Sequence, residues 1–585
     1  MLRTLRYLDG RQWGHVLVVL GLVLVQVWLD LLLPDFMATI TTLAETAGSR
    51  MEDILLQGAC MVLCALGSMA ATIAATYVGN RVAAGFAKTL RAEVFDHALT
   101  LSKGDVDRFG AGSLVNRCTN DITQIQTLVS MGLSAIIKAP IMVVWAAIKI
   151  VGYGWQWTAA TVVAATSLVI VLGITMAIAV PRYQRVQGLT DDINRLIREH
   201  LQGIRPIHAY NAEQYEQDRL DVTNDDITRT QTVATRATAV IGPILTLESS
   251  ALTLAIYWLG AGMVQAAAPG TSLSVFSEMV VFSNYAIQVI MSFMLLSMVF
   301  ILYPRAAISA RRVMEVIETE PTVKDGGGVT RQGEVGTVEF RDVSFSYPDD
   351  GARALSHVSF KVEKGQTVAF IGATGSGKTT LVQLVVRLFD ATEGSVLVDG
   401  QDVRDYTCEQ LHERVGYVPQ TATLFKGTVA SNVSYGETDH EITRADVEDA
   451  IAISQSTGFV EAMDGSYDAP IEQGGRNVSG GQRQRLAISR ALARKPEILV
   501  FDDSFSALDF ATDRSLRSEL AKRRPDTTYL IVAQRVSTIR DADQIVVLDH
   551  GEVVGKGTHD QLVGSCAAYQ EIVSSQLSKE EIAHV

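Results

Sequence analysis

The sequence predicts a chain of two parts, an α-helical membrane domain with six spans followed by an α/β domain. Six long apolar runs all lie before residue 303, and a glycine-rich loop between a short apolar strand and a helix lies in the second part. Residues 1–320 hold 23 Lys and Arg against 25 Asp and Glu, whereas residues 321–585 hold 27 against 39. The long apolar runs that contribute to the hydrophobic content of 48% therefore lie in the first part of the chain, whereas most of the net charge of −14 lies in the second.

Composition excludes several classes of protein. Intrinsically disordered chains are poor in apolar residues, which this chain is not. Its five cysteines are scattered and form no C-x-x-C pair, so a disulfide framework or a zinc knuckle is not expected. The second part is acidic and has no basic stripe, which argues against nucleic acid as a partner.

Each apolar run is long enough to cross a bilayer, which requires about 20 apolar residues in a helix. The runs cover residues 13–34, 54–79, 128–152, 157–180, 239–263 and 279–302. The second, fourth and sixth contain no Asp, Glu, Lys or Arg. Because no small-residue cleavage site follows the first run, we expect a membrane span there and not a signal peptide.

The distribution of Lys and Arg predicts that both ends of the chain are cytoplasmic. Three arginines precede the first span, six Lys or Arg residues separate the second and third spans, and eight arginines separate the fourth and fifth. The other three connections hold only Arg50. The two basic connections, each about fifty residues long, have the charge pattern of helices that project into the cytoplasm. We expect them to turn back near residues 104–112 and 209–217, where another surface docks.

A phosphate-binding loop is predicted in the second part. The apolar strand 367–371 leads into a segment that matches G-x-x-x-x-G-K-[ST], and a helical pattern follows it. The residues concerned are Gly372, Ala373, Thr374, Gly375, Ser376, Gly377, Lys378, Thr379 and Thr380. Backbone N–H groups of such a loop surround the phosphates, and the helix N-terminus adds positive charge. The lysine reaches the β- and γ-phosphates and the threonine hydroxyl binds Mg²⁺, so we predict an ATP–Mg²⁺ site.

Further motifs resemble those of the ATP-binding cassette (ABC) transporter family, in the family's order and spacing. Residues 477–482, NVSGGQ, are similar to the LSGGQ signature; residues 498–502 resemble the Walker B strand, 506–509 the D-loop and 472–475 the X-loop. The resemblance implies that Tyr347 stacks on adenine, that Asp502 holds Mg²⁺, and that Gln420 contacts Mg²⁺ and senses the γ-phosphate. It also assigns the D-loop to Asp509 and the signature to Ser479, Gly480, Gly481 and Gln482.

The resemblance covers essentially the whole chain and is to the exporter branch of the family. It implies a membrane domain at residues 1–318 and an ATP-binding cassette at 337–585, and the Pro and Gly content of residues 319–336 predicts a flexible linker between them. A working exporter contains two such halves, so the expected partner is a second half-transporter. In the dimer, the signature of each chain completes the partner's ATP site. The expected location is the cell membrane, as a multi-pass protein with a cytoplasmic ATPase domain.

Two residues depart from the family pattern, and both belong to the hydrolysis step. Asp503 stands where the family has the glutamate that polarises the attacking water, and Gln534 stands where it has the switch histidine. Aspartate is one methylene shorter, and a glutamine amide cannot become cationic. Loss of such a base typically costs about 10²–10⁴ in rate. We therefore expect this chain to bind ATP well, to hydrolyse it slowly, and to form a heterodimer with an intact partner.

Several alternatives remain open at this stage. The two departures can be changes tolerated in a slow homodimer. The cargo of an exporter is expected to be amphipathic or drug-like, but the same machinery also serves lipid flipping or uptake. A third class is a nucleotide-gated regulator that does not transport. Within the membrane, Glu248 in the fifth span is either a contact for cationic cargo or a structural partner of Lys138 or Lys149.

Overall fold

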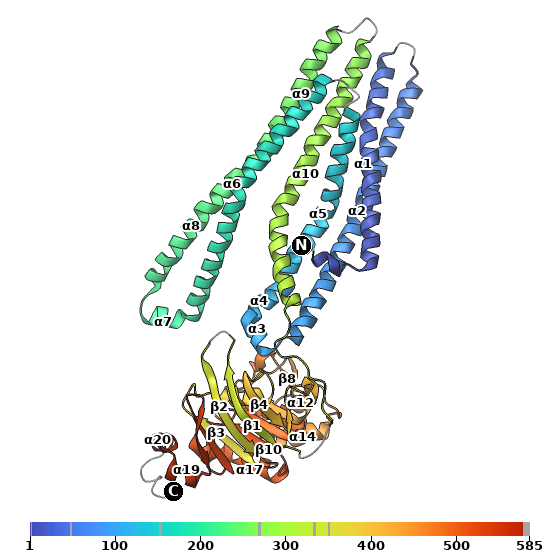
Figure 1. Cartoon of the computed structure of the whole chain (residues 1–585). Helices are drawn as coiled ribbons and strands as arrows, with labels where there is room; N and C mark the ends of the chain where they lie inside the picture. Colours follow the sequence, from blue (N-terminus) through green and yellow to red (C-terminus); the bar gives the residue numbers. More distant parts are fainter. Residues whose placement is uncertain are drawn as a thin grey trace. The chain divides into compact units, whose positions relative to one another are not determined.

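The computed structural model describes residues 1, 3–46, 49–150, 155–266, 271–330, 335–348 and 351–576. It divides the chain into two compact units, which we describe separately (Figure 1). The membrane unit comprises Met1–Leu99 and Gly112–Thr319, and the cassette unit comprises Thr100–Ala111 and Glu320–Val585. The end of the third predicted span at 151–152, part of the predicted linker at 331–334, and the predicted cassette end at 577–585 lie outside the described residues.

Within the described residues, six helices are long and apolar enough to cross a membrane, as predicted. They are α1 (Gly10–Glu45), α2 (Met51–Thr100), α5 (Ile122–Ile150), α6 (Trp155–Gln202), α9 (Ile241–Ala266) and α10 (Ser272–Glu318). A short turn, η1 (Thr4–Tyr7), precedes α1, and α4 (Ala111–Asn116) with the π-helical turn η2 (Arg117–Asp121) leads into α5. Helix α2 has 50 residues and α6 has 48. At about 1.5 Å per residue, each is more than twice as long as a hydrocarbon core of about 30 Å is thick. The predicted long extensions are therefore continuous with the spans.

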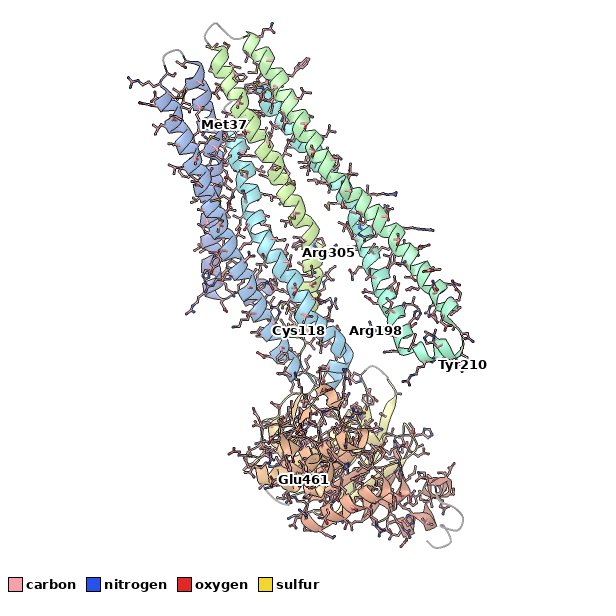
Figure 2. All side chains as sticks on the ribbon, turned by 180° about the vertical axis from the view of Figure 1, so that it is seen from behind. Met37, Cys118, Arg198, Tyr210, Arg305 and Glu461 are labelled. Carbon is pink, nitrogen blue, oxygen red and sulfur yellow. The ribbon has the colours of Figure 1, made fainter. Side chains whose placement is uncertain are left out.

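The second extension is a helical hairpin made by α6, α7 (Ile204–Ala209) and α8 (Glu213–Ala239). Figure 2 shows Tyr210 at its tip, and 84% of this residue is exposed. A hydrogen bond of 2.5 Å joins His200 to Glu216, and an ion pair of 3.4 Å joins Arg219 to Glu199. The tip lies within the turn that the sequence predicts near 209–217.

The apolar core of the membrane unit is formed by one face of α1 together with residues of α2, α5, α6, α9 and α10. The buried residues of α1 recur every fourth position: Val19, Val23, Val27 and Leu31. This spacing places them on one helix face. Across the core, the rings of Trp157 and Phe282 lie 5.5 Å apart. Packing against neighbouring helices selects this face of α1, because exposed positions such as Leu17 and Trp28 are apolar as well.

Polar groups within the spans are paired between helices. Asp30 and Asp35 of α1 form ion pairs with Lys138 at 3.3 Å and Lys149 at 2.7 Å, both on α5. The Tyr285 hydroxyl of α10 also donates to Asp35, at 2.7 Å. Charged side chains are costly in a membrane unless they are paired in this way. The three helices are therefore joined by polar contacts as well as by packing.

The cassette unit contains a mixed six-stranded sheet, a four-stranded antiparallel sheet and a two-stranded antiparallel sheet. The six-stranded sheet has the order β12 (Glu552–Gly557), β11 (Gln544–Asp549), β3 (Thr367–Gly372), β10 (Thr528–Val532), β9 (Ile498–Asp502) and β6 (Val415–Val418). The other sheet has the order β2 (Arg353–Val362), β1 (Val338–Ser346), β4 (Glu393–Val398) and β5 (Gln401–Asp402), and β7 (Gly427–Thr428) pairs with β8 (Pro470–Ile471). Strands β11, β3, β10, β9 and β6 are parallel, so their carboxyl ends meet at one edge.

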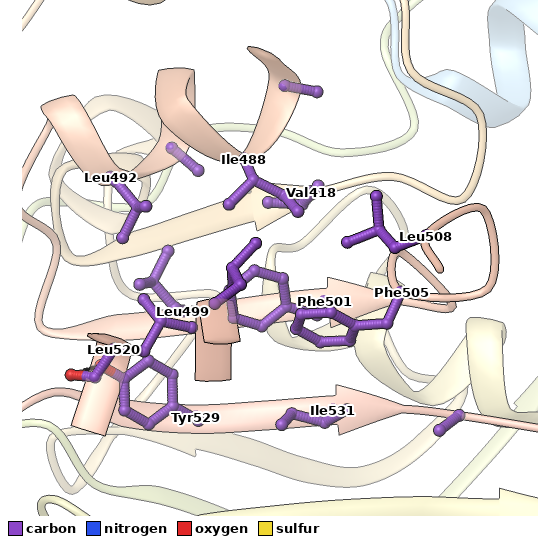
Figure 3. Close-up of a cluster of buried hydrophobic side chains, with 14 of the residues drawn as sticks. Val418, Ile488, Leu492, Leu499, Phe501, Phe505, Leu508, Leu520, Tyr529 and Ile531 are labelled. Carbon is purple, nitrogen blue, oxygen red and sulfur yellow. Dashed lines mark hydrogen bonds between the residues drawn. The ribbon is translucent and has the colours of Figure 1, made fainter. Parts of the chain in front are cut away.

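Helices cover the sheets of this unit. They are α3 (Lys103–Phe109), α11 (Lys378–Val385), α12 (Cys408–Arg414), α13 (Val429–Val433), α14 (Arg444–Ile453), α15 (Thr457–Glu461), α16 (Gly480–Ala493), α17 (Phe510–Arg523), α18 (Val536–Ile539), α19 (His559–Ser565) and α20 (Ala567–Gln576). Successive residues of the central strands enter two different cores, because side chains alternate between the faces of a sheet. On β9, Val500 enters the core shared with the four-stranded sheet, whereas Phe501 enters the core beneath α16. Figure 3 shows Phe501 against Phe505 and below Ile488 of α16.

The short helix α3 belongs to the cassette unit although α2 and α5 precede and follow it in sequence. Ser102 caps α3, and the Asp105 carboxylate accepts bonds from the backbone of Ser102 at 3.1 Å and of Thr322 at 3.0 Å. Burial would raise the pKa of Asp105, but these bonds outweigh it and hold the pKa below its ordinary value. Gly104 lies against Phe389, whose ring is 3.0 Å from the place a Cβ would take. The predicted turn near 104–112 thus packs on the cassette.

Candidate active site

The predicted phosphate loop connects β3 to α11 and has a backbone that requires glycine. Gly375 and Gly377 have φ of +84° and +95°, a region that favours glycine. A Cβ on Gly377 would lie 2.7 Å from the Ala354 carbonyl oxygen, and one on Gly372 would lie 2.0 Å from that of Leu548. The loop therefore packs closely against the segments that carry Ala354 and Leu548, and it leads directly into α11.

Lys378, the first residue of α11, lies over this loop. Its Nζ donates to the carbonyl oxygens of Gly372 at 2.9 Å and Ala373 at 2.7 Å, and to the Ser376 hydroxyl at 3.2 Å. Burial lowers the pKa of Lys378, and the nearby carboxylates partly oppose this shift. A cation held by neutral carbonyls at the mouth of an N–H-rich loop is placed to bind phosphate oxygens.

Thr379 and Asp502 form the part of the site suited to Mg²⁺. The Thr379 hydroxyl donates to Asp502 Oδ1 at 2.8 Å, and the Tyr417 hydroxyl donates to Oδ2 at 3.1 Å. Burial raises the pKa of Asp502, and these two hydrogen bonds partly oppose the rise. Mg²⁺ prefers oxygen ligands and usually takes only one or two carboxylates besides substrate phosphates. The donor set therefore fits Mg²⁺, which Thr379 and Asp502 would hold and which would neutralise phosphate charge.

Tyr347 lies beside Thr380, the third residue of α11. Its hydroxyl is 2.9 Å from the Thr380 hydroxyl, and its ring makes an edge contact with Phe389 at 5.4 Å. The residue predicted to stack on adenine is thus next to the phosphate loop, as a nucleotide site requires. Its partner Phe389 is the ring that packs on Gly104 of α3.

Asp503 meets two glutamine side chains. Its Oδ2 accepts hydrogen bonds from Gln534 Nε2 at 2.9 Å and from Gln420 Nε2 at 3.3 Å. Asp503 is only 7% exposed, and burial raises its pKa, with the Gln420 bond opposing the rise. Its φ of +49° is unusual for a residue with a side chain. The two departures from the family pattern are therefore in direct contact.

The signature and the D-loop occupy helix starts. Ser479 caps α16 and forms a reciprocal capping box with Gln482, while Gly480 is exposed. A Cβ on Gly481 would lie 3.2 Å from the carbonyl oxygen of Ala507 in the D-loop. Asp509 caps α17 by accepting from the Thr512 backbone at 2.9 Å, and this bond lowers its pKa. Within the described part of the chain, the side-chain bond of Ser479 remains inside its own capping box.

The structure brings together most of the predicted ATP-site residues, Gln420 among them. The Gln420 amide donates to Asp503 and not to the Thr379–Asp502 pair. Its contact with Mg²⁺ remains a prediction. Sequence reasoning missed Tyr417, the second donor to Asp502. A hydroxyl-bearing aromatic near the end of a short apolar strand, three residues before Gln420, was the available signal.

In the membrane unit, Glu248 of α9 accepts a hydrogen bond from the Ser167 hydroxyl of α6 at 3.3 Å. The expectation that Glu248 pairs with Lys138 or Lys149 is not met, because both lysines pair with aspartates of α1. Lys138 forms its ion pair with Asp30, and Lys149 forms its ion pair with Asp35. Glu248 thus has a neutral partner in the described structure.

This combination of a six-helix membrane unit and a Walker-type cassette defines an ABC transporter. Residues 14–293 match the family model of the ABC transporter transmembrane region, and residues 355–506 match the family model described as ABC transporter. The chain belongs to the ABC transporter family, as a half-transporter with the exporter fold.

Individual relatives agree with this assignment. An uncharacterized ABC transporter ATP-binding protein of Mycobacterium tuberculosis is 38% identical over 88% of this chain and 87% of the relative. An ATP-dependent lipid A-core flippase of Aromatoleum aromaticum is 32% identical over 86% of this chain and 83% of the relative. The solved structure of a bacterial Atm1-family ABC exporter with ATP bound matches with a TM-score of 0.83 and 25% identity, over 97% of this chain and 99% of that chain.

Proposed function

We propose that this chain is one half of a heterodimeric ATP-driven exporter whose own Walker site holds ATP–Mg²⁺ and hydrolyses it slowly. The observation that carries the proposal is the double hydrogen bond from Gln534 and Gln420 to the short carboxylate of Asp503. The loop from Gly372 to Gly377 and Lys378 would bind the phosphates, Tyr347 would stack on adenine, and the signature of this chain would complete the partner's site.

The arrangement favours ATP binding over hydrolysis for a physical reason. A general base must come within about 3 Å of the attacking water, and Asp503 is one methylene shorter than the glutamate usual there. Its Oδ2, moreover, is already engaged by two amide donors. Gln534 can donate a hydrogen bond to phosphate but cannot carry the charge that a histidine supplies. The binding residues are all present, so only the chemical step is impaired.

The direct test uses the purified full-length chain in lipid nanodiscs. We expect it to bind ATP in the presence of Mg²⁺ with little hydrolysis, and we expect hydrolysis to appear when a half-transporter carrying Glu and His at the corresponding positions is co-expressed. The control is Lys378→Ala, which should lose ATP binding itself. Robust ATPase activity from the lone chain would contradict the proposal and favour a homodimer.

We further propose that the cargo is an amphipathic molecule with a cationic group that contacts Glu248. Among the described residues this carboxylate is bonded to the neutral Ser167 hydroxyl, while Lys138 and Lys149 are neutralised by aspartates. Glu248→Gln should abolish uptake of amphipathic amines into inverted vesicles and leave basal ATPase unchanged. A variant that fails to insert or fold would instead assign Glu248 a structural role.

A second candidate function is lipid translocation, which is favoured by the similarity to lipid A-core flippases. The two functions are distinguished in proteoliposomes. ATP-dependent movement of a labelled lipid between leaflets, unaffected by Glu248→Gln, would favour lipid translocation. Transport of an amphipathic amine that depends on Glu248 would favour export of drug-like cargo.

A further inference from the structure

Gln576, the last residue of α20, bridges the segment that carries Gln534. Its Nε2 donates to the Gln534 carbonyl oxygen at 2.6 Å, and its Oε1 accepts from the Val536 backbone N–H at 2.9 Å. A carbonyl needs a donor and an N–H needs an acceptor, so only one orientation of the Gln576 amide satisfies both. One side chain thus closes a ring over residues 534–536, which we call the switch segment.

The switch segment lacks the local cap that neighbouring helices have. Helix α18 begins at Val536, and its N-cap residue Arg535 makes no side-chain capping bond. Other cassette helices are capped by the residue directly before them: Thr407, Thr443, Ser479, Asp509 and Thr558. The first N–H of a helix has no partner inside the helix and needs one from outside. Gln576 therefore supplies the hydrogen-bond acceptor for the first N–H of α18, which the N-cap residue Arg535 does not supply.

Helix α20 is held firmly enough to serve this purpose. Tyr569 and Val573 are 0% and 3% exposed and belong to the same apolar core as Val536. The Tyr569 hydroxyl forms a hydrogen bond of 2.7 Å with His559 Nδ1. Packed residues at both of these helix positions fix where Gln576 projects, although its own side chain is exposed.

We propose that Gln576 is a positioning residue for the Walker site of this chain. It fixes the backbone of the switch segment, and the Gln534 side chain, held by that backbone, donates to Asp503 at 2.9 Å. The end of α20 is thereby connected to the Asp503 carboxylate through Gln576 and Gln534. The structural part of this inference stands by itself, and only its effect on hydrolysis rests on the proposed function of Asp503 and Gln534.

The structural part is tested by hydrogen–deuterium exchange on the full-length protein in nanodiscs. In Gln576→Ala we expect amide exchange in the peptide covering residues 533–540 to be about 3- to 10-fold faster, the effect of losing about one net hydrogen bond. The matched control is Gln570→Ala, since Gln570 lies on the same helix and donates to the Val563 carbonyl oxygen at 2.6 Å, away from the switch segment. Equal exchange in wild type and Gln576→Ala would overturn the inference.

The functional part is tested in a background where this site can hydrolyse ATP, the Asp503→Glu/Gln534→His double variant. Adding Gln576→Ala should lower kcat about 3- to 10-fold and leave KM for ATP unchanged, because the phosphate loop is untouched. Adding Gln570→Ala should change neither constant. An equal loss from both substitutions, or a change confined to KM, would refute a positioning role. If the double variant is itself inactive, the proposed function fails, and the exchange experiment alone decides the role of Gln576.

Discussion

At the scale of single residues, the two departures from the family pattern form one structural unit. The Asp503 carboxylate and the Gln534 amide meet at 2.9 Å. An amide is a good donor to a carboxylate and stabilises it without titrating near neutral pH. The pair therefore has a stable arrangement of its own, which explains how both positions can differ while Lys378, Thr379 and Asp502 keep their usual identities.

Restoring both residues should restore hydrolysis at this site. We predict that Asp503→Glu/Gln534→His raises the rate of ATP hydrolysis at this chain's own site, in a heterodimer whose partner site is inactivated, by about 10²–10⁴, the usual contribution of a general base. Each single substitution should give a smaller gain. In Asp503→Glu the longer carboxylate would still face a neutral amide, and in Gln534→His the imidazole would face a carboxylate that is too short. The measurement is steady-state phosphate release in nanodiscs. A double variant as slow as wild type would show that another feature limits hydrolysis.

The hydrogen bond from Tyr417 to Asp502 leads us to predict that Mg²⁺ binding depends on pH. This bond lowers a pKa that burial has raised, so Tyr417→Phe should raise that pKa further. A protonated carboxyl group cannot hold Mg²⁺, and Mg²⁺ affinity should therefore fall as pH decreases, beginning at a higher pH in the variant than in wild type. Mg²⁺ titrations of ATP binding at several pH values provide the measurement. Identical pH profiles would contradict this account.

At the scale of elements, helix α3, which lies between α2 and α5 in sequence, contacts Phe389 and Thr322 of the cassette unit. Its Asp105 is tied to Thr322 of the linker, and its Gly104 packs on Phe389, which in turn contacts Tyr347. All of these contacts lie inside the cassette unit. A nucleotide that orders Tyr347 would thereby act on residues in contact with α3.

The close approach at Gly104 gives a specific prediction. In Gly104→Val, the added side chain would collide with the Phe389 ring and displace α3, at a cost of about 1–3 kcal/mol. We expect ATP binding to persist while transport and its coupled ATPase activity are lost. Gly112→Val is the matched control, since among the described residues no heavy atom other than those of its chain neighbours and its own helix backbone lies within 4 Å of the place where its Cβ would be. Normal transport by Gly104→Val, or equal loss in both variants, would refute a role for this contact in coupling.

Local sequence patterns predicted the elements better than their contacts. The apolar runs indicated six spans, and the strand–loop–helix pattern indicated the phosphate loop, because length and local chemistry determine both. The Asp503–Gln534 bond joins residues 31 apart, and the Lys149–Asp35 pair joins residues 114 apart. Such pairings depend on how elements pack, which no periodicity encodes. Most of the site residues chosen by motif spacing nevertheless lie together, at the edge where the parallel strands of the six-stranded sheet end.

At the scale of the whole molecule, one chain contains only half of what an exporter needs. The membrane unit pairs Lys138 and Lys149 with aspartates and leaves Glu248 with a neutral partner. The cassette unit has a complete phosphate loop, and its signature serine bonds only within its own capping box among the described contacts. Both features are consistent with sites that a second half-transporter completes.

The decisive prediction for the assembled transporter concerns Ser479. In the heterodimer, Ser479→Ala should lower ATP hydrolysis about 100-fold or more, because it removes a donor to the phosphates bound in the partner's site. The substitution lies outside the Walker site of this chain, so ATP binding by the lone chain should not change. Thr558→Ala is the matched control, since Thr558 caps α19 through the same capping box with a glutamine three residues later. Both variants lose a helix cap, worth about 1 kcal/mol, but only Ser479→Ala should stop turnover. Equal ATPase rates in the two variants would show that this signature does not serve a partner's site.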